Sequence, residues 1–177
     1  FTYAYWEEPD GFLHAEGSDS QNVHNTIEEL NKKIELLCAT LQDTVVFITA
    51  DHGHIDIQMD YFEENYPDFA KMLVRPVSIE PRGISFYVKD EFIPVFKEKF
   101  LELFGSDYLI FSKEEVFQNK LFGPGNPHPN LTGIGDFLAP AIGTKTMFWN
   151  KTSPIFKSHH AGLTSQEMKI PLIVVEK

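Results

Sequence analysis

Three short polar clusters in the sequence combine residue types that bind divalent metals. They are Asp10 with His14, the adjacent pair Asp51 and His52, and the adjacent histidines His159 and His160. Carboxylate oxygens and imidazole nitrogens are common ligands of zinc and related ions. Each cluster alone is a weak signal, because a surface turn with a solvated Asp-His pair has the same composition.

The spacing within the first two clusters favours convergence of the side chains. Residues four apart, such as Asp10 and His14, lie on the same face of a helical turn, so both can reach one ion. Asp51 and His52 are adjacent and would point to opposite faces of a regular strand. Gly53 follows them and allows the backbone to turn, which can bring both side chains to one point.

Apolar segments precede the first two clusters and predict the elements that hold them. Residues 45–48 are β-branched or aromatic and predict a strand that is buried on both faces. Residues 1–6 are largely aromatic and predict another strand, which ends at the turn formed by Pro9 and Gly11. Polar groups at the carboxyl ends of such strands lie where open α/β sheets bind their ligands.

One apolar stripe lies between these two predicted strands. It recurs at alternating steps of four and three residues: Val23, Ile27, Leu30, Ile34, Leu37 and Leu41. This spacing predicts an amphipathic helix, so strand, helix and strand follow in order. The order predicts an α/β fold with a mixed, mostly parallel central sheet and helices on both faces.

The second half of the chain continues this alternation. Residues 83–89 predict a strand, residues 92–104 a helix and residues 108–111 another strand. The capping-box sequence from Ser112 to Glu115 predicts a short helix that ends at Lys120. Residues 136–142 and 146–149 predict a hairpin, and residues 172–175 predict a closing strand.

Composition limits the classes of partner. The chain has 177 residues, the size of one domain, and no composition change divides residues 1–177. Its formal net charge of −11 and its two arginines disfavour binding to a nucleic-acid backbone. No apolar run is long enough to predict a membrane span. The single cysteine, Cys38, rules out an intrachain disulfide and leaves the compartment undetermined.

The three clusters, in their order along the chain, resemble the motifs of the alkaline phosphatase superfamily. The segments are P-D-x-x-x-H from Pro9, T-A-D-H-G from Thr49 and H-A-G-L-T-x-x-E-M-x-x-P-L-I from His160. They are most similar to the type I phosphodiesterase/nucleotide pyrophosphatase branch. The resemblance implies that residues 1–177 are the C-terminal portion of a single alkaline phosphatase-like catalytic domain, incomplete at the N-terminus.

The resemblance also implies two divalent metal ions, and zinc is the expected metal. Asp10, His14 and His160 match three ligands of one ion, and Asp51 and His52 match two ligands of the other. Two ions about 4 Å apart suit phosphoryl chemistry, because they clamp the attacking and leaving oxygens. By this assignment His159 is the neighbour of a ligand, and His54 supports the ligands or lines the pocket wall.

Family members carry a nucleophilic Thr or Ser, and a further metal-binding Asp, on strands that precede the P-D motif. No residue of this sequence matches either, so no nucleophile is assigned. We therefore expect at most one well-formed metal site in this chain. We also expect little or no hydrolysis by the chain alone.

The implied function of the intact protein is metal-dependent hydrolysis of a small phosphate ester or nucleotide. The Asp51 and His52 ion would lower the pKa of the attacking hydroxyl, and the other ion would stabilise the leaving oxygen. Phosphomonoesterase, phosphomutase and sulfatase activities occur in the same superfamily and stay open. A non-catalytic metal-binding module is a further alternative, as is a set of purely structural turns.

Overall fold

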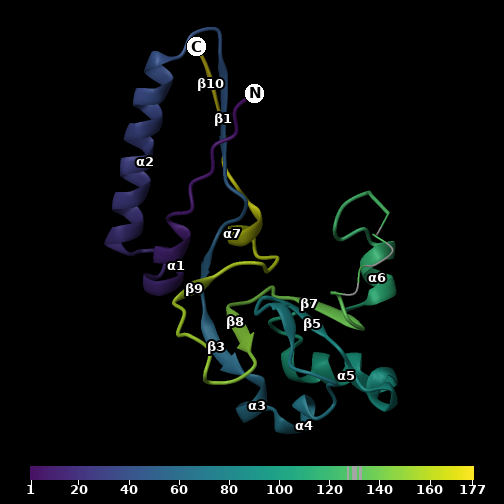
Figure 1. Cartoon of the computed structure of the whole chain (residues 1–177). Helices are drawn as coiled ribbons and strands as arrows, with labels where there is room; N and C mark the ends of the chain where they lie inside the picture. Colours follow the sequence, from purple (N-terminus) through teal and green to yellow (C-terminus); the bar gives the residue numbers. More distant parts are fainter. Residues whose placement is uncertain (127, 129–130, 132) are drawn as a thin grey trace. The chain divides into compact units, whose positions relative to one another are not determined.

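The computed structural model describes residues 1–126, 128, 131 and 133–177. The chain divides into two compact units (Figure 1). Unit 1 comprises Phe1–Ile57, Ile155–His160 and Ser165–Lys177, and unit 2 comprises Gln58–Pro154 and Ala161–Thr164. Both units combine helices with strands, so the predicted α/β class is confirmed. The expectation that residues 1–177 belong to a single domain stays a prediction.

Unit 1 is built from segments near the two ends of the sequence. Its helices are α1 (Asp10–Glu16), α2 (Gln21–Thr40) and α7 (Ser165–Met168). Its strands are β1 (Val45–Thr49), β2 (Ile55–Asp56), β9 (Ser158–His159) and β10 (Leu172–Glu176). Strand β1 pairs antiparallel with β10, and β2 pairs antiparallel with β9. The polar loop between β1 and β2 is therefore anchored on both sides by the C-terminal part of the chain.

Helix α2 begins directly after a capping residue, Ser20. The side chain of Ser20 accepts a hydrogen bond of 3.2 Å from the backbone N–H of Val23, which satisfies one free donor of the first turn. Val23 is buried, but Ile27 and Leu37 of the same apolar stripe are 51% and 54% exposed. The apolar stripe thus predicts the helix correctly, but it does not show which residues pack against its apolar face.

Strand β1 is less buried than its composition predicts. Val45 is 52% exposed and Phe47 is 67% exposed, whereas Val46 and Ile48 are half-buried. Among the described residues, β1 has β10 as its single partner strand. A two-stranded ribbon shields few side chains, so an apolar run alone does not show that both faces are covered.

The predicted strand at residues 1–6 is wrong, because residues 1–7 form no regular element. Their aromatic side chains are largely exposed, including Tyr3 at 76% and Trp6 at 54%. The Lys33 ammonium of α2 lies 4.8 Å from the ring centroid of Trp6. A strand requires a partner, and none of the described strands pairs with this segment.

Unit 2 contains a four-stranded antiparallel sheet in the order β4-β5-β7-β6 and a parallel pair, β3 and β8. The strands are β3 (Gln58–Tyr61), β4 (Ser78–Glu80), β5 (Gly83–Phe86), β6 (Phe111–Ser112), β7 (Phe137–Pro140) and β8 (Lys145–Phe148). The helices are α3 (Phe62–Asn65), α4 (Pro67–Ala70), α5 (Ile93–Phe104) and α6 (Lys113–Gln118), with a 3₁₀ turn at Asp90–Phe92. The predicted capping box at the start of α6 is present.

The direction of strand pairing differs from the prediction of a mostly parallel sheet. The described ladders are antiparallel except for β3–β8. Strands β7 and β8 do not form the predicted hairpin. Because β7 pairs with β5 on one edge and with β6 on the other, it has no free edge for β8, which pairs with β3. Local patterns predict strands but not their partners.

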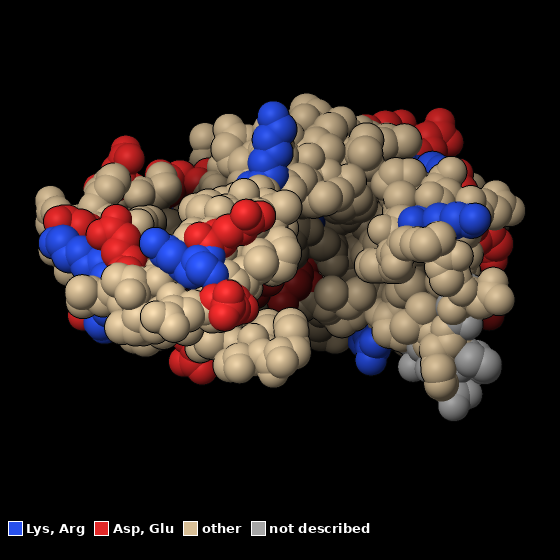
Figure 2. Space-filling model, turned by 90° about the horizontal axis from the view of Figure 1, so that it is seen from above, with Lys and Arg blue, Asp and Glu red and all other residues tan. Residues whose placement is uncertain are grey.

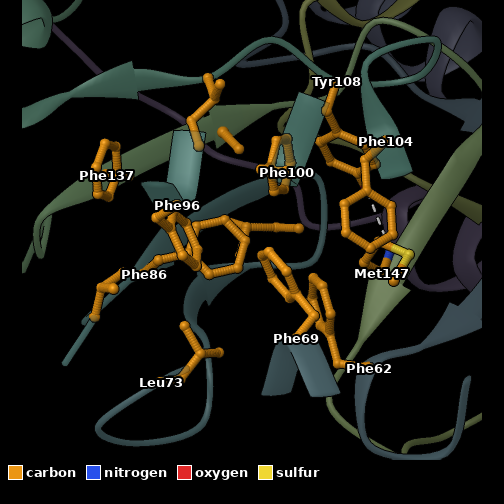
Figure 3. Close-up of a cluster of buried hydrophobic side chains, with 14 of the residues drawn as sticks. Phe62, Phe69, Leu73, Phe86, Phe96, Phe100, Phe104, Tyr108, Phe137 and Met147 are labelled. Atoms are coloured by element: carbon orange, nitrogen blue, oxygen red, sulfur yellow. Dashed lines mark hydrogen bonds between the residues drawn. The ribbon is translucent and has the colours of Figure 1, made fainter. Parts of the chain in front are cut away.

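An aromatic cluster forms the core of unit 2 (Figure 3). Helix α5 presents Phe96, Phe100 and Phe104 at four-residue steps on one face, and all three side chains are fully buried. The buried hydroxyl of Tyr108 donates to the Pro81 carbonyl oxygen and accepts a hydrogen bond from the Met147 backbone N–H, each at 3.0 Å. The Tyr108 hydroxyl therefore both donates and accepts a hydrogen bond, as buried polar groups usually do.

Surface charge is predominantly negative, as the net charge of −11 requires. On the face shown in Figure 2, Lys and Arg side chains are scattered among Asp and Glu side chains. Within the described residues, no helix combines the length and apolarity that a membrane crossing requires.

Candidate metal centre

Helix α1 places Asp10 and His14 on the same face. Asp10 is the first helical residue, and His14 follows one turn later. The Nε2 atom of His14 lies 3.6 Å from Oδ1 of Asp10. The four-residue spacing therefore produces the side-by-side arrangement that a shared ligand needs.

Hydrogen bonds join the segment around β9 to the end of α1. The Ser158 hydroxyl donates to the Leu13 carbonyl oxygen, and the Lys157 backbone N–H donates to the His14 carbonyl oxygen, both at 2.8 Å. These bonds bring the next residues of the segment close to α1. As a result, Nε2 of His160 lies 4.0 Å from Oδ1 of Asp10, although the two residues are far apart along the chain.

Four side chains gather into one group, which we call the Asp10 cluster: Asp10, His14, His54 and His160. One candidate ligand atom from each residue lies within 4.8 Å of the others. Bonds from zinc to nitrogen or oxygen are about 2 Å long, so two ligand atoms of one ion are separated by at most about 4 Å. Small side-chain adjustments would therefore let one ion contact the cluster. Its donor set, a carboxylate oxygen and imidazole nitrogens, is one that zinc accepts.

The proton positions of His14 suit a metal ligand. Its Nδ1 atom lies 2.9 Å from the Ser158 carbonyl oxygen, which can only accept, so Nδ1 carries the proton. Nε2 is then left with a lone pair on the side of Asp10. A backbone carbonyl that fixes the distal ring nitrogen is a common arrangement around metal-bound histidines.

The pKa values of Asp10 and His160 are both lowered. Burial, followed by the neighbouring His52 and the other histidines, lowers the pKa of His160 to about 4. Burial alone would raise the pKa of Asp10, but its 2.8 Å contact with the His54 ring and the nearby imidazoles lower it. At neutral pH His160 is therefore neutral and Asp10 is ionised, and these are the forms that bind metals.

Asp51 and His52 lie beside the Asp10 cluster rather than within it. The His52 ring stacks on the His160 ring, with centroids 3.8 Å apart and planes inclined by 18°. The Nδ1 atom of His52 donates to the Gly53 carbonyl oxygen at 3.2 Å, and Nε2 lies 3.7 Å from Oδ1 of Asp51. Among the described residues, no third His, Cys, Asp or Glu joins this pair in a compact group.

The remaining histidines of the three motifs have different surroundings. His159 is 5% exposed, and its Nδ1 accepts a hydrogen bond of 3.0 Å from the His160 backbone N–H. The sequence predicts a supporting role for His54, but the structure puts it inside the Asp10 cluster. The one sequence feature that points to His54 as a ligand is its position two residues after His52 in D-H-G-H. The pairing of β2 with β9 brings His54 close to α1, and the sequence does not predict this pairing.

Gly53 is required by close packing between the β1–β2 loop and α7. The Gly53 backbone N–H donates to the Glu167 carbonyl oxygen at 2.9 Å. A Cβ atom at Gly53 would lie 2.0 Å from the Gln166 backbone oxygen, well inside van der Waals contact. The glycine therefore fixes where His52 and His54 stand, because any side chain there would push the loop away from α7.

We expect the substitution Gly53→Ala to destabilise unit 1 by about 1–3 kcal/mol, the usual cost of overpacking, and to weaken metal binding. Chemical denaturation and a zinc titration measure the two effects. Gly125→Ala is the matched control, because no atom lies within 4 Å of a Cβ placed there. Equal stability and equal zinc affinity of the Gly53→Ala and Gly125→Ala variants would contradict the packing role of Gly53.

Comparison with known proteins identifies a family. Residues 1–93 match the sequence model of the type I phosphodiesterase / nucleotide pyrophosphatase family. The matched segment contains the first two polar clusters. No curated protein matches the chain significantly.

Several solved structures share the fold. Human ectonucleotide pyrophosphatase/phosphodiesterase 5 is 17% identical, with a TM-score of 0.71 over 96% of this chain and 45% of its own. An inactive variant of the murine protein in complex with AMP is 18% identical, with a TM-score of 0.67 over 95% of this chain and 45% of its own. Phosphonoacetate hydrolase from Sinorhizobium meliloti 1021, in complex with phosphonoformate, is 16% identical, with a TM-score of 0.64 over 93% of this chain and 43% of its own.

This chain therefore spans less than half the length of the solved proteins that it resembles. At these identities the likeness shows a shared fold, and the family assignment rests on the sequence model. That model covers more than half of the 177 residues. The chain belongs to the type I phosphodiesterase/nucleotide pyrophosphatase family.

Proposed function

We propose that the intact protein is a metal-dependent hydrolase of phosphate esters, with phosphodiesters or nucleotide pyrophosphates as its substrate class. The observation that carries this proposal is the convergence of Asp10, His14 and His160 on one point, in a chain of this family. The AMP complex of the murine relative supports a nucleotide-type substrate.

Zinc is the metal that best fits the donor set, because nitrogen-rich sites with one carboxylate suit zinc better than magnesium or calcium. We propose a second ion at Asp51 and His52, with its other ligands supplied by sequence that precedes Phe1. Ions at the two positions would stabilise negative charge on the phosphate oxygens and lower the pKa of the nucleophilic hydroxyl. We propose that this hydroxyl also belongs to a Thr or Ser in the preceding sequence.

The residues of this chain hold the ligand atoms in place. His14 is fixed by its Nδ1–H bond to the Ser158 carbonyl oxygen, and its Nε2 points toward Asp10. His52 is fixed in the same way by the Gly53 carbonyl oxygen and is stacked on His160. Because these rings are oriented in advance, little conformational entropy is lost when the ligands engage.

Ester preference and metal dependence test the proposal together. The intact protein and the 177-residue chain are assayed on bis-p-nitrophenyl phosphate and on p-nitrophenyl phosphate, before and after chelation, and again with added zinc. We expect the intact protein to prefer the diester, to lose activity on chelation and to regain it with zinc. We expect the 177-residue chain to be inactive or nearly so.

Each contrary result has a distinct meaning. Activity that survives complete chelation would contradict the metal mechanism. A preference for the monoester would move the function to the phosphatase branch of the superfamily. Rapid diester turnover by the 177-residue chain would contradict a nucleophile located in preceding sequence. Metal binding by the intact protein without hydrolysis of either ester would favour a non-catalytic module.

A further inference from the structure

His54 is the buried member of the Asp10 cluster, and its two ring nitrogens have different neighbours. Its side chain is 4% exposed. Nε2 lies 2.8 Å from Oδ1 of Asp10, and Nδ1 lies 3.0 Å from Oγ of Ser158. Its ring centroid is 4.8 Å from that of His14 and 5.0 Å from that of His160.

The Ser158 hydroxyl determines which nitrogen of His54 carries a proton. A serine hydroxyl has one hydrogen to donate. Ser158 donates it to the Leu13 carbonyl oxygen at 2.8 Å, because a carbonyl oxygen can only accept. The contact between Oγ and Nδ1 must therefore be a hydrogen bond from the His54 ring to Ser158, so Nδ1 carries the proton.

This arrangement leaves Nε2 of neutral His54 with a lone pair that faces a carboxylate oxygen. Two lone pairs at 2.8 Å repel each other unless a cation lies between them or beside both, and that cation can be a proton or a metal ion. In contrast, a histidine that only supports a ligand donates an N–H group to it. In neutral His54 the single N–H group donates to Ser158, so no N–H group is left to donate to Asp10.

We propose that Nε2 of His54 is a direct ligand of the ion held by Asp10, His14 and His160. The inference rests on the proposed metal centre and goes beyond it, because the family resemblance gives His54 no bond to metal. It implies four protein ligands at this centre: one carboxylate oxygen and three imidazole nitrogens. Four ligands complete the tetrahedron that zinc prefers, so substrate would have to enter as a fifth ligand or displace one of them.

The donor set also defines the class of ion. Three imidazole nitrogens select zinc and similar transition-metal ions, because magnesium and calcium prefer oxygen ligands. A fourth protein ligand also increases retention of the ion. In the 177-residue chain, the centre at Asp10 should therefore keep its zinc through dilution and mild chelation, whereas the two-ligand position at Asp51 and His52 should exchange zinc freely.

Long-range nitrogen–proton NMR of the 177-residue chain labelled with ¹⁵N-histidine tests the proposal. This experiment reports the tautomer of each ring and identifies nitrogens bound to zinc. We expect one equivalent of zinc to move the Nε2 signals of His14, His54 and His160 into the metal-bound range. Exposed His24 should keep its signals. An Nε2 of His54 that bears hydrogen in the zinc-loaded chain would overturn the inference.

The same spectra separate this inference from the proposed function. If His14 and His160 bind zinc and His54 does not, the fourth ligand is excluded and the metal centre stands. If none of the three histidines responds to zinc, the metal centre itself is contradicted. The measurement needs no substitution, so it decides the question even where a variant fails to fold.

A substitution series gives a second readout. Glutamine at position 54 can place an amide N–H group beside Asp10 but has no imidazole nitrogen. We expect His54→Gln to lower zinc affinity by at least about 100-fold, more than the loss of about 10–100-fold that follows removal of a supporting group, measured by competition with a chromophoric chelator. His24→Gln, on an exposed helix face, is the matched control and should bind zinc as the unchanged chain does. A loss below about 100-fold in folded His54→Gln would contradict a direct bond from His54 to the ion.

Discussion

Replacing Asp10 with asparagine is expected to abolish stoichiometric zinc binding by the 177-residue chain. Asp10 is the single anionic member of the Asp10 cluster, and its ionised carboxylate offsets part of the charge of the dication. Loss of a group that merely supports a ligand costs about 10–100-fold in metal affinity, so loss of a direct, charged ligand should cost at least about 100-fold. In the intact protein, the same substitution should remove the proposed chelator-sensitive hydrolysis.

Competition with a chromophoric chelator measures this loss, and the metal content after dialysis checks it. Asp19→Asn is the matched control, because it makes the same chemical change at an exposed position of unit 1. Circular dichroism of both variants shows whether the fold is retained. Folded Asp10→Asn that binds zinc as tightly as Asp19→Asn would exclude Asp10 as a ligand.

Replacing Phe86 with alanine is expected to destabilise unit 2 by about 3–5 kcal/mol. Phe86 is fully buried at the centre of the aromatic cluster (Figure 3). Its ring centroid lies between 5.3 and 6.1 Å from those of four other aromatic rings, which are Phe62, Phe69, Phe96 and Phe100. Removing the ring forfeits its transfer free energy and leaves a cavity among rigid neighbours, which cannot collapse to fill it.

The tryptophans allow the loss to be assigned to unit 2. Trp149 packs against the aromatic cluster, whereas Trp6 belongs to unit 1. Urea unfolding followed by Trp149 fluorescence in a Trp6→Phe background therefore reports on the substituted core. The control is Phe122→Ala, whose side chain is 69% exposed and whose loss should cost less than about 0.5 kcal/mol. A loss below about 1 kcal/mol for Phe86→Ala would contradict its central place in the core.

Local sequence signals predict the parts of the candidate centre that depend on local geometry. The four-residue spacing of Asp10 and His14 corresponds to one turn of α1. The stripe from Val23 corresponds to α2, and the capping box at Ser112 corresponds to the start of α6. In each case the interacting residues lie within a few positions of one another, so the sequence contains the whole interaction.

The pairing of distant segments is not predictable from such signals. His54 enters the Asp10 cluster because β2 pairs with β9 and because Ser158 binds both the His54 ring and the end of α1. Likewise, β8 joins β3 because β5 and β6 occupy both edges of β7. Strand register depends on tertiary contacts, so an alternating or apolar run specifies neither its partner nor the coverage of its faces.

Anomalous diffraction at the zinc absorption edge, from crystals of the 177-residue chain grown with zinc, tests the central claim most directly. We predict a strong peak within bonding distance of Oδ1 of Asp10 and Nε2 of both His14 and His160. We predict a weaker peak, or none, at Asp51 and His52. Zinc at other positions with no peak at the Asp10 cluster would contradict the proposed metal centre and, with it, the proposed metal-dependent hydrolysis.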